Sequence, residues 1–288
     1  MKWKKSNYVI MYSLVIGVIL AVTLVLIIPV NQAYSILNSG DNGYTMLSGN
    51  TCLILYNLKD LENIEAEKNL LVVERGALFR QDELDYILDF VEKGGIVVAS
   101  GLPNTTIQML EYNGLKVEFY GFVYDPVFSA NTSELVFVND VVYNKTIVLD
   151  TPYHVVITNN PGVEVTRIFY TSDFSFIDQN NDKHYTVGEY IGKIPVAYEV
   201  KIGNGRLVIV LARSIMANRV YKYNIEWLTH LSEGRCIIID QSWVKSNPIL
   251  YFKSLVYSQR GISPAYASIT AILAALVVVY AIKHLYSQ

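Results

Sequence analysis

The 288-residue sequence predicts an α/β protein in which a domain built on a parallel sheet, with a β-rich insertion, lies between two transmembrane helices. Two long uncharged apolar runs stand near the ends of the chain, at 8–30 and 262–282. Between them, short apolar runs alternate with segments of helical periodicity, which is typical of a parallel sheet covered on both faces. The stretch at about 122–170 holds strand-like runs separated by Asn, Asp, Pro and Gly, and this pattern predicts the insertion.

The first apolar run, Tyr8–Val30, predicts a membrane-spanning helix. As an α-helix it would reach roughly 34 Å, enough to cross a hydrocarbon core of about 30 Å. Three lysines lie in the preceding tail, 1–7, and no Lys or Arg follows before Lys59, so the positive-inside rule places the tail in the cytoplasm. A cleaved signal peptide is the alternative. The length of the run, and the lack of a small residue two positions before Ala33, favour a retained anchor.

The second run, Pro264–Ile282, predicts another span of roughly 28 Å, with a buried core helix as the alternative. It would return the tail 283–288 to the cytoplasm. The sequence therefore predicts a two-span plasma-membrane protein, archaeal in its composition, whose main domain, 31–261, is extracytoplasmic. Small residues recur at every fourth position in both runs, and they either mediate helix packing, within one chain or across a homodimer, or reflect ordinary membrane composition. They are Ser13, Gly17 and Ala21, and Ser263, Ala267, Ala271 and Ala275.

Composition limits the partners of the chain. The net charge of −3, without a basic run beyond the N-terminal tail, excludes nucleic-acid binding. Cys52 and Cys236 border strand-like runs of the exported region, where they would form a disulfide or stay as two buried thiols. Sequons for glycosylation begin at Asn104, Asn131 and Asn144. Export would therefore allow the protein to be a glycoprotein.

The elements of the main domain follow from their periodicity. Apolar residues at helical spacing predict a helix over 84–91, and the strands at 70–73 and 96–99 complete a βαβ unit. A hairpin is predicted at Gly203-Asn204-Gly205. The remaining predicted elements are a strand at 52–56, a helix at 105–112, an edge strand at 115–119, the hairpin strands at 196–200 and 207–211, a helix at 225–231 and a buried strand at 236–239.

The most specific local pattern is a loop with calcium-binding spacing. Oxygen-bearing residues stand at positions 1, 3, 5, 7, 9 and 12 of this loop, from which they can converge on one hard cation. Lys183 departs from the pattern, because position 6 favours Gly for its sharp turn and Lys adds positive charge. The alternative is a solvated loop without metal. The predicted Ca²⁺ ligands are Asp178, Asn180, Asp182, His184 (through its backbone carbonyl), Thr186 and Glu189.

Several short segments carry a resemblance to a known family: Asn-Ser-Gly-Asp-Asn-Gly at 38–43, Glu-Lys-Gly-Gly-Ile-Val-Val at 92–98, the loop 178–189, and Gly-Asn-Gly-Arg-Leu-Val at 203–208. With them the chain resembles the domain-of-unknown-function 4350 family. The exported domain of that family is similar to the class I glutamine amidotransferase-like, Rossmann-like fold, and it is often held between two membrane helices. The resemblance implies association with membrane assembly or transport machinery served by ATPases.

Two strand ends depart from the family pattern. After the strand that ends near Leu211, the family usually shows an acidic residue and an Asn. Here Asn218 can fill the Asn position, but Ala212-Arg213-Ser214 lacks the acid. Near the last strand, Asp240-Gln241-Ser242-Trp243 lacks the family's His. A family site at these strand ends would therefore be incomplete in this chain.

The residue patterns argue against catalysis. The chain has no Gly-x-Cys-x-Gly or Gly-x-Ser-x-Gly nucleophile elbow and no phosphate-binding loop. Ser100-Gly101, directly after a strand, is the nearest candidate for a nucleophile turn, and the sequence identifies no base for it. The histidines are dispersed and form no metal-ligand pair at helical spacing: His154, His184, His230 and His284.

These observations predict a non-catalytic extracytoplasmic binding domain that acts as an accessory subunit of a cell-envelope membrane complex, with another membrane protein as its partner. One alternative is a degenerate or unrecognised hydrolase, which needs a nucleophile and a base within hydrogen-bond reach. Another is a receptor for a small envelope ligand such as a glycan. Such a receptor needs exposed aromatic side chains around a cleft.

Overall fold

The computed structural model describes residues 13–14, 16–25, 28–158 and 163–257. The chain divides into two compact units. The smaller unit comprises Met1–Val30 and Val244–Gln288, and its described part includes helical residues at 13–14 and 16–25 and the helix α6 (Pro248–Tyr257). The larger unit, Asn31–Trp243, holds the sheet and the candidate sites.

The helices correct the predicted membrane topology. Within the first predicted span, 8–30, the structure describes helical residues at 13–14 and 16–25. A span needs about 20 consecutive apolar residues. Among the residues that the structure describes, no helix is long and apolar enough to cross a membrane, so the predicted two-span plasma-membrane localisation is not supported. The second predicted span, 262–282, and both tails lie outside the described residues.

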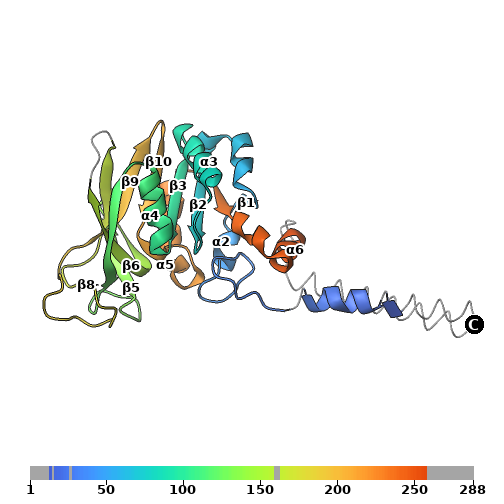
Figure 1. The fold of residues 1–288 in the computed structure, drawn as a ribbon, viewed down its shortest axis with the longest axis horizontal. Helices are drawn as coiled ribbons and strands as arrows, with labels where there is room; N and C mark the ends of the chain where they lie inside the picture. Colours follow the sequence, from blue (N-terminus) through green and yellow to red (C-terminus); the bar gives the residue numbers. More distant parts are fainter. Residues whose placement is uncertain (1–12, 15, 26–27, 159–162, 258–288) are drawn as a thin grey trace, which may run out of the picture. The chain divides into compact units, whose positions relative to one another are not determined.

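A mixed sheet of 12 strands forms the frame of the larger unit (Figure 1). The strands lie in the order β1 (Leu53–Leu55), β12 (Cys236–Asp240), β2 (Asn69–Arg75), β3 (Ile96–Gly101), β10 (Gly205–Val210), β9 (Pro195–Ile202), β7 (Val165–Tyr170), β5 (Leu135–Asp140), β6 (Lys145–Thr158), β4 (Lys116–Tyr124) and β8 (Phe176–Asp178), with β11 (Ala212–Ser214) against β6. From β1 across the sheet to β10, neighbouring strands are parallel, and the other pairings are antiparallel.

The sheet also corrects the predicted fold class. Four pairings are parallel and seven are antiparallel, so the domain is not the parallel-sheet, glutamine amidotransferase-like (Rossmann-like) domain that the sequence predicted. The physical reason is the type of connection. The strands from β4 to β9 follow one another without an intervening helix, and such connections favour antiparallel neighbours, whereas parallel neighbours need a long crossover. The β-rich stretch at 122–170 therefore continues the main sheet.

Two local predictions are confirmed. β2 and β3 are parallel neighbours, with the helix α3 (Gln81–Glu92) between them in sequence, as the βαβ pattern indicated. β9 and β10 form the predicted hairpin, in which Gly205 lies opposite Ile202. Gly203 has a φ of 57° in this turn, and a Cβ there would approach the carbonyl oxygen of Glu92 to 2.6 Å. A side chain at that position is therefore excluded by conformation and by space.

Helices cover both faces of the parallel part of the sheet (Figure 1). Besides α3, α6 and the helical residues at 13–14 and 16–25, the described helical elements are α2 (Thr45–Ser48), η1 (Leu58–Asn63), η2 (Ala66–Lys68), α4 (Pro103–Tyr112), α5 (Asn218–Ser232) and η3 (Ser242–Ser246). Alternate residues of β2 enter two different cores: Leu71 and Val73 pack with the side chains of α3, and Leu70 and Val72 belong to the core that α5 joins.

Candidate functional site

The carboxyl ends of parallel strands are where α/β proteins usually hold their ligands. In this protein a buried carboxylate occupies that place. Glu74, near the end of β2, accepts hydrogen bonds from the hydroxyls of Ser100 and Ser214, the latter at 2.6 Å, and from the backbone N–H groups of Ile215 and Met216 at 2.7 and 3.1 Å. Burial raises the pKa of Glu74 to about 7, although these hydrogen bonds favour the ionised form.

Ser100 and Glu74 are a nucleophile and a base within hydrogen-bond reach, but solvent does not reach them. Ser100 is 2% exposed and Glu74 is 0% exposed. The neighbouring Arg75 is also engaged, because its guanidinium donates to Asp240 at 2.6 Å and to Glu83 at 3.1 Å. These contacts tie β2 to β3, to β12 and to the start of α3. The cluster therefore has a structural role.

The residues at the family-implied positions hold the N-terminal segment of the larger unit. Asn218 donates from Nδ2 to the carbonyl oxygens of Gly40 and Asn38, at 2.7 and 3.2 Å. Gln241 donates from Nε2 to the carbonyl oxygen of Tyr34 at 2.8 Å. The loop 38–43 is thus fixed against α5, and the segment before it against the end of β12.

The loop with calcium-binding spacing satisfies its first carboxylate internally. Asp178 accepts the backbone N–H groups of Asn181 and Lys183 at 2.7 and 2.9 Å. Lys183 adopts the left-handed conformation, with φ 63°, at the position where Gly is favoured. Its Nζ pairs with Glu134 at 2.6 Å, so its charge is partly offset outside the loop.

The other predicted ligands also bond within the loop. Asn180 donates from Nδ2 to Asp182 at 3.0 Å, and Asp182 accepts the backbone N–H of His184 at 2.8 Å. Glu189 accepts the backbone N–H of Thr186 at 2.9 Å. Within the described ranges, no group of three His, Cys, Asp or Glu side chains is arranged to hold a metal ion. Calcium binding by this loop stays a prediction.

A short two-stranded ribbon leads from this loop to a different surface feature. Phe176, in β8, forms a bridge with Ile191, which follows the loop. Beyond the bridge, the backbone N–H of Gly192 donates to the carbonyl oxygen of Ser175 at 2.9 Å, and Phe174 and Lys193 are the next residues on the two segments. Both of these residues line a hollow in the surface.

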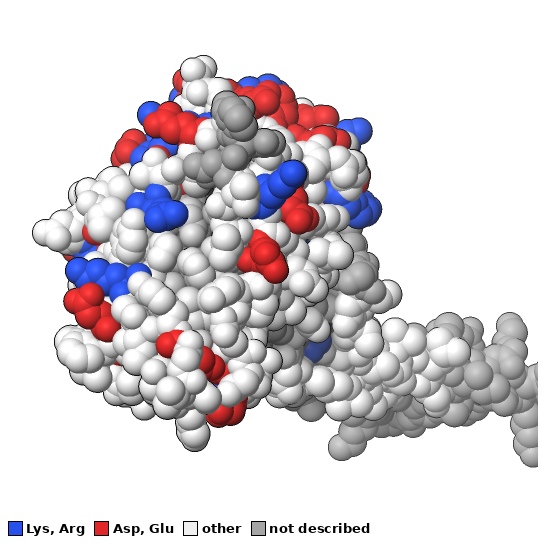
Figure 2. Space-filling view, turned by 60° about the vertical axis from the view of Figure 1, so that its left-hand side comes forward, with Lys and Arg blue, Asp and Glu red and all other residues white. Residues whose placement is uncertain are grey.

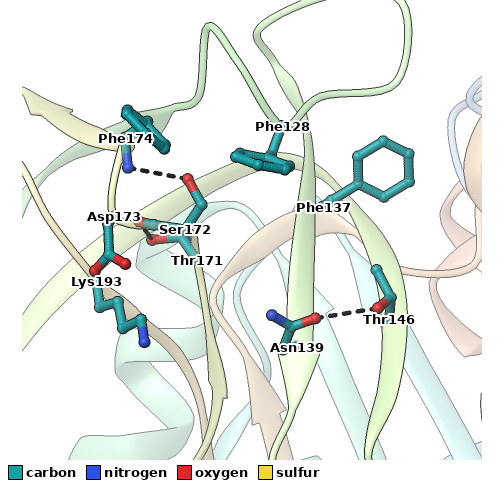
Figure 3. A pocket seen from close by; sticks show the side chains of 9 residues that line it. All are labelled: Phe128, Phe137, Asn139, Thr146, Thr171, Ser172, Asp173, Phe174 and Lys193. Carbon is teal, nitrogen blue, oxygen red and sulfur yellow. Dashed lines mark hydrogen bonds between the residues drawn. The ribbon is translucent and has the colours of Figure 1, made fainter.

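An aromatic cleft of about 470 Å³ opens among the loop after β4, the strand β5 and the loop after β7 (Figure 3). On its rim the rings of Phe128 and Phe174 stack, with centroids 5.9 Å apart and planes 29° apart, and the two residues stay 48% and 55% exposed. Below them, Thr146 donates from Oγ1 to Asn139 Oδ1 at 3.0 Å. The residues that line the aromatic cleft are Phe128, Phe137, Asn139, Thr146, Thr171, Ser172, Asp173, Phe174 and Lys193.

One buried carboxylate holds both loops of the rim. Asp125 is 0% exposed, and its Oδ1 accepts the backbone N–H groups of residues 127–128 at 2.9 and 2.6 Å. Its Oδ2 accepts the hydroxyls of Ser172 and Ser175 at 2.5 and 2.8 Å. Ser172 in turn accepts the backbone N–H of Phe174 at 3.0 Å. One side chain therefore holds both of the loops that carry the stacked rings.

No family model matches the chain, and no curated protein matches it. Among solved structures, the N-terminal domain of mmIFT52 is similar at a TM-score of 0.43 and 11% identity, over 62% of this chain and 80% of that one. A cold-adapted β-galactosidase from Rahnella sp. R3 has a TM-score of 0.36 and 14% identity, over 57% of this chain but 22% of the enzyme. A ThuA-like protein from Bacteroides uniformis has a TM-score of 0.34 and 14% identity, over 62% and 73%. Likenesses this weak say nothing about function, and the resemblance to the domain-of-unknown-function 4350 family stays a prediction.

The two cysteines lie on neighbouring strands but at different levels. Leu53 of β1 lies opposite Ile238 of β12, which places Cys52 level with Ile237. Since side chains alternate along a strand, Cys52 and Cys236 point to opposite faces of the sheet. This geometry disfavours a disulfide, which was one of the two alternatives that the sequence left open.

The three sequon asparagines are all exposed. Asn131 and Asn144 lie in turns and have φ values of 73° and 51°, whereas Asn104 lies in the first turn of α4. Their modification stays a prediction that depends on export.

The aromatic cleft was not found by sequence analysis. Its residues come from segments that are far apart in the chain, and none of them forms a catalytic or metal-binding pattern. The only signal was local. Asp125 stands two and three positions before 127 and 128, the spacing at which a side-chain oxygen can accept backbone N–H groups and cap a turn. That signal identifies a turn and gives no indication of the second loop.

Proposed function

We propose that this protein is a non-catalytic binding domain and that the aromatic cleft is its ligand site. One observation carries the proposal: Asp125 fixes the two loops that hold Phe128 and Phe174 exposed beside a hollow of about 470 Å³. Exposed aromatic area is unfavourable in water, at roughly 25 cal/mol per Å². A site in which that area is already ordered loses less entropy when a ligand covers it.

The strand ends support binding over catalysis. Ser100, the nucleophile candidate there, and Glu74, the carboxylate beside it, are buried and hydrogen-bonded to each other. The segment that contains Tyr34 packs at the same ends through Gln241. A hydrolase would need Ser100 to become accessible to substrate, and Ser100 is 2% exposed.

Association with another protein, as predicted for an accessory subunit, is a second candidate function. In the loop 178–189, Val187 has 91% of its surface exposed, and Tyr190 and Ile191 follow at 51% and 49%. Gentle extraction of the tagged chain, followed by mass spectrometry, tests it. A stoichiometric partner that is retained by the natural chain and lost from Val187→Ser would support this candidate; a chain that is isolated alone would contradict it.

Saturation-transfer NMR on the full chain tests the cleft. The probes are three sets of small molecules: neutral methyl glycosides, neutral aromatic amides and phosphorylated compounds. We expect at least one set to receive saturation from the natural chain and to lose it with the double variant Phe128→Ala/Phe174→Ala. Phe119→Ala is the matched control, because Phe119 is a 40% exposed aromatic residue that does not line the cleft. Equal transfer to the double variant for every set would refute the proposed function.

A further inference from the structure

We infer that the ligand of the aromatic cleft is a neutral saccharide. This inference rests on the proposed function and adds the chemical class of the ligand. Three properties of the lining residues support it: the aromatic surface on the rim, the mixture of hydrogen-bond donors and acceptors below it, and the balance of charge.

The rim suits a ring that has one apolar face. Phe128 and Phe174 are stacked and about half exposed, so a ring face can be covered without moving them. The face of an aromatic ring carries partial negative charge and attracts weakly positive C–H groups. A pyranose presents several C–H groups on one face and hydroxyls around its edge. It can therefore cover the rings while its hydroxyls point toward the polar residues.

The polar residues offer both donors and acceptors. Asn139 accepts from Thr146 through Oδ1, and its Nδ2 points away from that bond in Figure 3. The ammonium of Lys193 is a second donor, and the carboxylate of Asp173 is an acceptor. A sugar hydroxyl both donates and accepts, so vicinal hydroxyls match a mixed set of this kind. A sugar hydroxyl can donate to Asp173, whereas a ligand with only acceptors cannot.

The charges of the cleft point to a neutral ligand. Lys193 and Asp173 are its only charged lining residues and offset one another. Neither forms an ion pair with another side chain in the described part of the structure, so both are available to a ligand. On the face shown in Figure 2, acidic and basic residues are interspersed without a broad patch of one sign. A phosphorylated ligand would need more positive charge than this.

The size of the cleft fits a small saccharide. Its volume of about 470 Å³ lies within the roughly 300–1,000 Å³ typical of small-molecule sites. Since the rim is open to solvent, a longer glycan could continue beyond it.

The test is titration of the full chain with neutral methyl glycosides and disaccharides, followed by NMR and calorimetry. Two variants of the rim separate ring stacking from apolar bulk. Phe128→Tyr keeps the ring and should leave the affinity within about threefold, while Phe128→Leu keeps the bulk without the ring and should weaken binding about tenfold. Asn139→Ala should weaken binding as well. Lys193→Gln should weaken it without making it depend on salt, since the ligand has no charge.

The outcomes separate this inference from the proposed function. Binding of a neutral glycoside with the expected order of Phe128 variants supports both. If phosphorylated or aromatic probes bind at the cleft and no glycoside does, the saccharide inference is overturned while the binding function stands. If no probe responds to the rim variants, both are overturned.

Discussion

The variant Asp125→Ala tests directly how the aromatic cleft is held. The substitution removes the acceptor of four hydrogen bonds, at 2.5 to 2.9 Å. The hydroxyl of Ser175 is fully buried and would lose its partner. The other three donors, in residues 127–128 and Ser172, belong to residues that solvent reaches, so water can replace the carboxylate.

The magnitude follows from this difference between the donors. A buried donor that loses a charged acceptor costs about 1.5–3 kcal/mol, and each donor that water can satisfy costs about 0.5 kcal/mol. The sum predicts a decrease of about 3–4.5 kcal/mol in the free energy of unfolding of the larger unit. For a unit of this size each kcal/mol lowers Tm by roughly 2–4 °C, which gives a decrease of roughly 6–18 °C.

Urea denaturation and thermal melting of the full chain would measure the change. Asp125→Asn is the matched variant: its Oδ1 can still accept from residues 127–128, and we expect a loss of about 1 kcal/mol. Asp173→Ala is the surface control, because Asp173 is exposed, and it should stay within about 0.5 kcal/mol of the natural chain.

Two results would refute this account of the cleft. One is an Asp125→Ala variant within about 0.5 kcal/mol of the natural chain. The other is undiminished saturation transfer to the cleft probes, because the orientation of both rim loops depends on this carboxylate.

Three further predictions concern pH, metal and backbone space. Burial raises the pKa of Glu74 to about 7, above its ordinary value of 4.5, so the stability that it contributes is complete below pH 4.5 and is lost as the pH rises through 7. The free energy of unfolding should therefore fall between pH 5 and pH 8 by about 3 kcal/mol more in the natural chain than in Glu74→Gln. An equal fall in the two chains would contradict this. Calcium at 1 mM should raise Tm by roughly 3–6 °C if the loop binds with a Kd of about 0.1 mM, an effect absent with Glu189→Gln, and an unchanged Tm would reject the calcium site. Gly43→Ala should destabilise the larger unit by about 1–3 kcal/mol, because its Cβ would lie 1.8 Å from the carbonyl oxygen of Asn38, whereas Gly49→Ala, with ordinary contacts, should change little.

The local elements could be predicted because they depend on nearby residues. The helix after β2 and the turn at Gly203 follow from apolar spacing and from glycine at a left-handed position, and both are present. The predicted class of the sheet was wrong, because the direction of pairing depends on which strands become neighbours in the folded sheet. Strands such as β5 and β7 are short apolar runs that would suit a parallel or an antiparallel neighbour equally well.

The membrane prediction is corrected by the described helices. It rested on the length of two apolar runs, and no helix among the described residues is long and apolar enough to cross a membrane. For the two cysteines, the sequence left a disulfide and two separate buried thiols open. Both residues border strands as predicted, but a register offset by one residue turns their side chains apart.

The sequence by itself determined the βαβ unit, the hairpin, the loop with calcium-binding spacing and the absence of a recognisable nucleophile elbow, since each is encoded within a few neighbouring residues. The tertiary structure alone decided the site. Phe128 and Phe174 are 46 positions apart, and they meet because Asp125 accepts hydrogen bonds from both loops at once. The convergence of four hydrogen-bond donors on one carboxylate depends on the tertiary structure, and the periodicity of residues along the chain does not predict it.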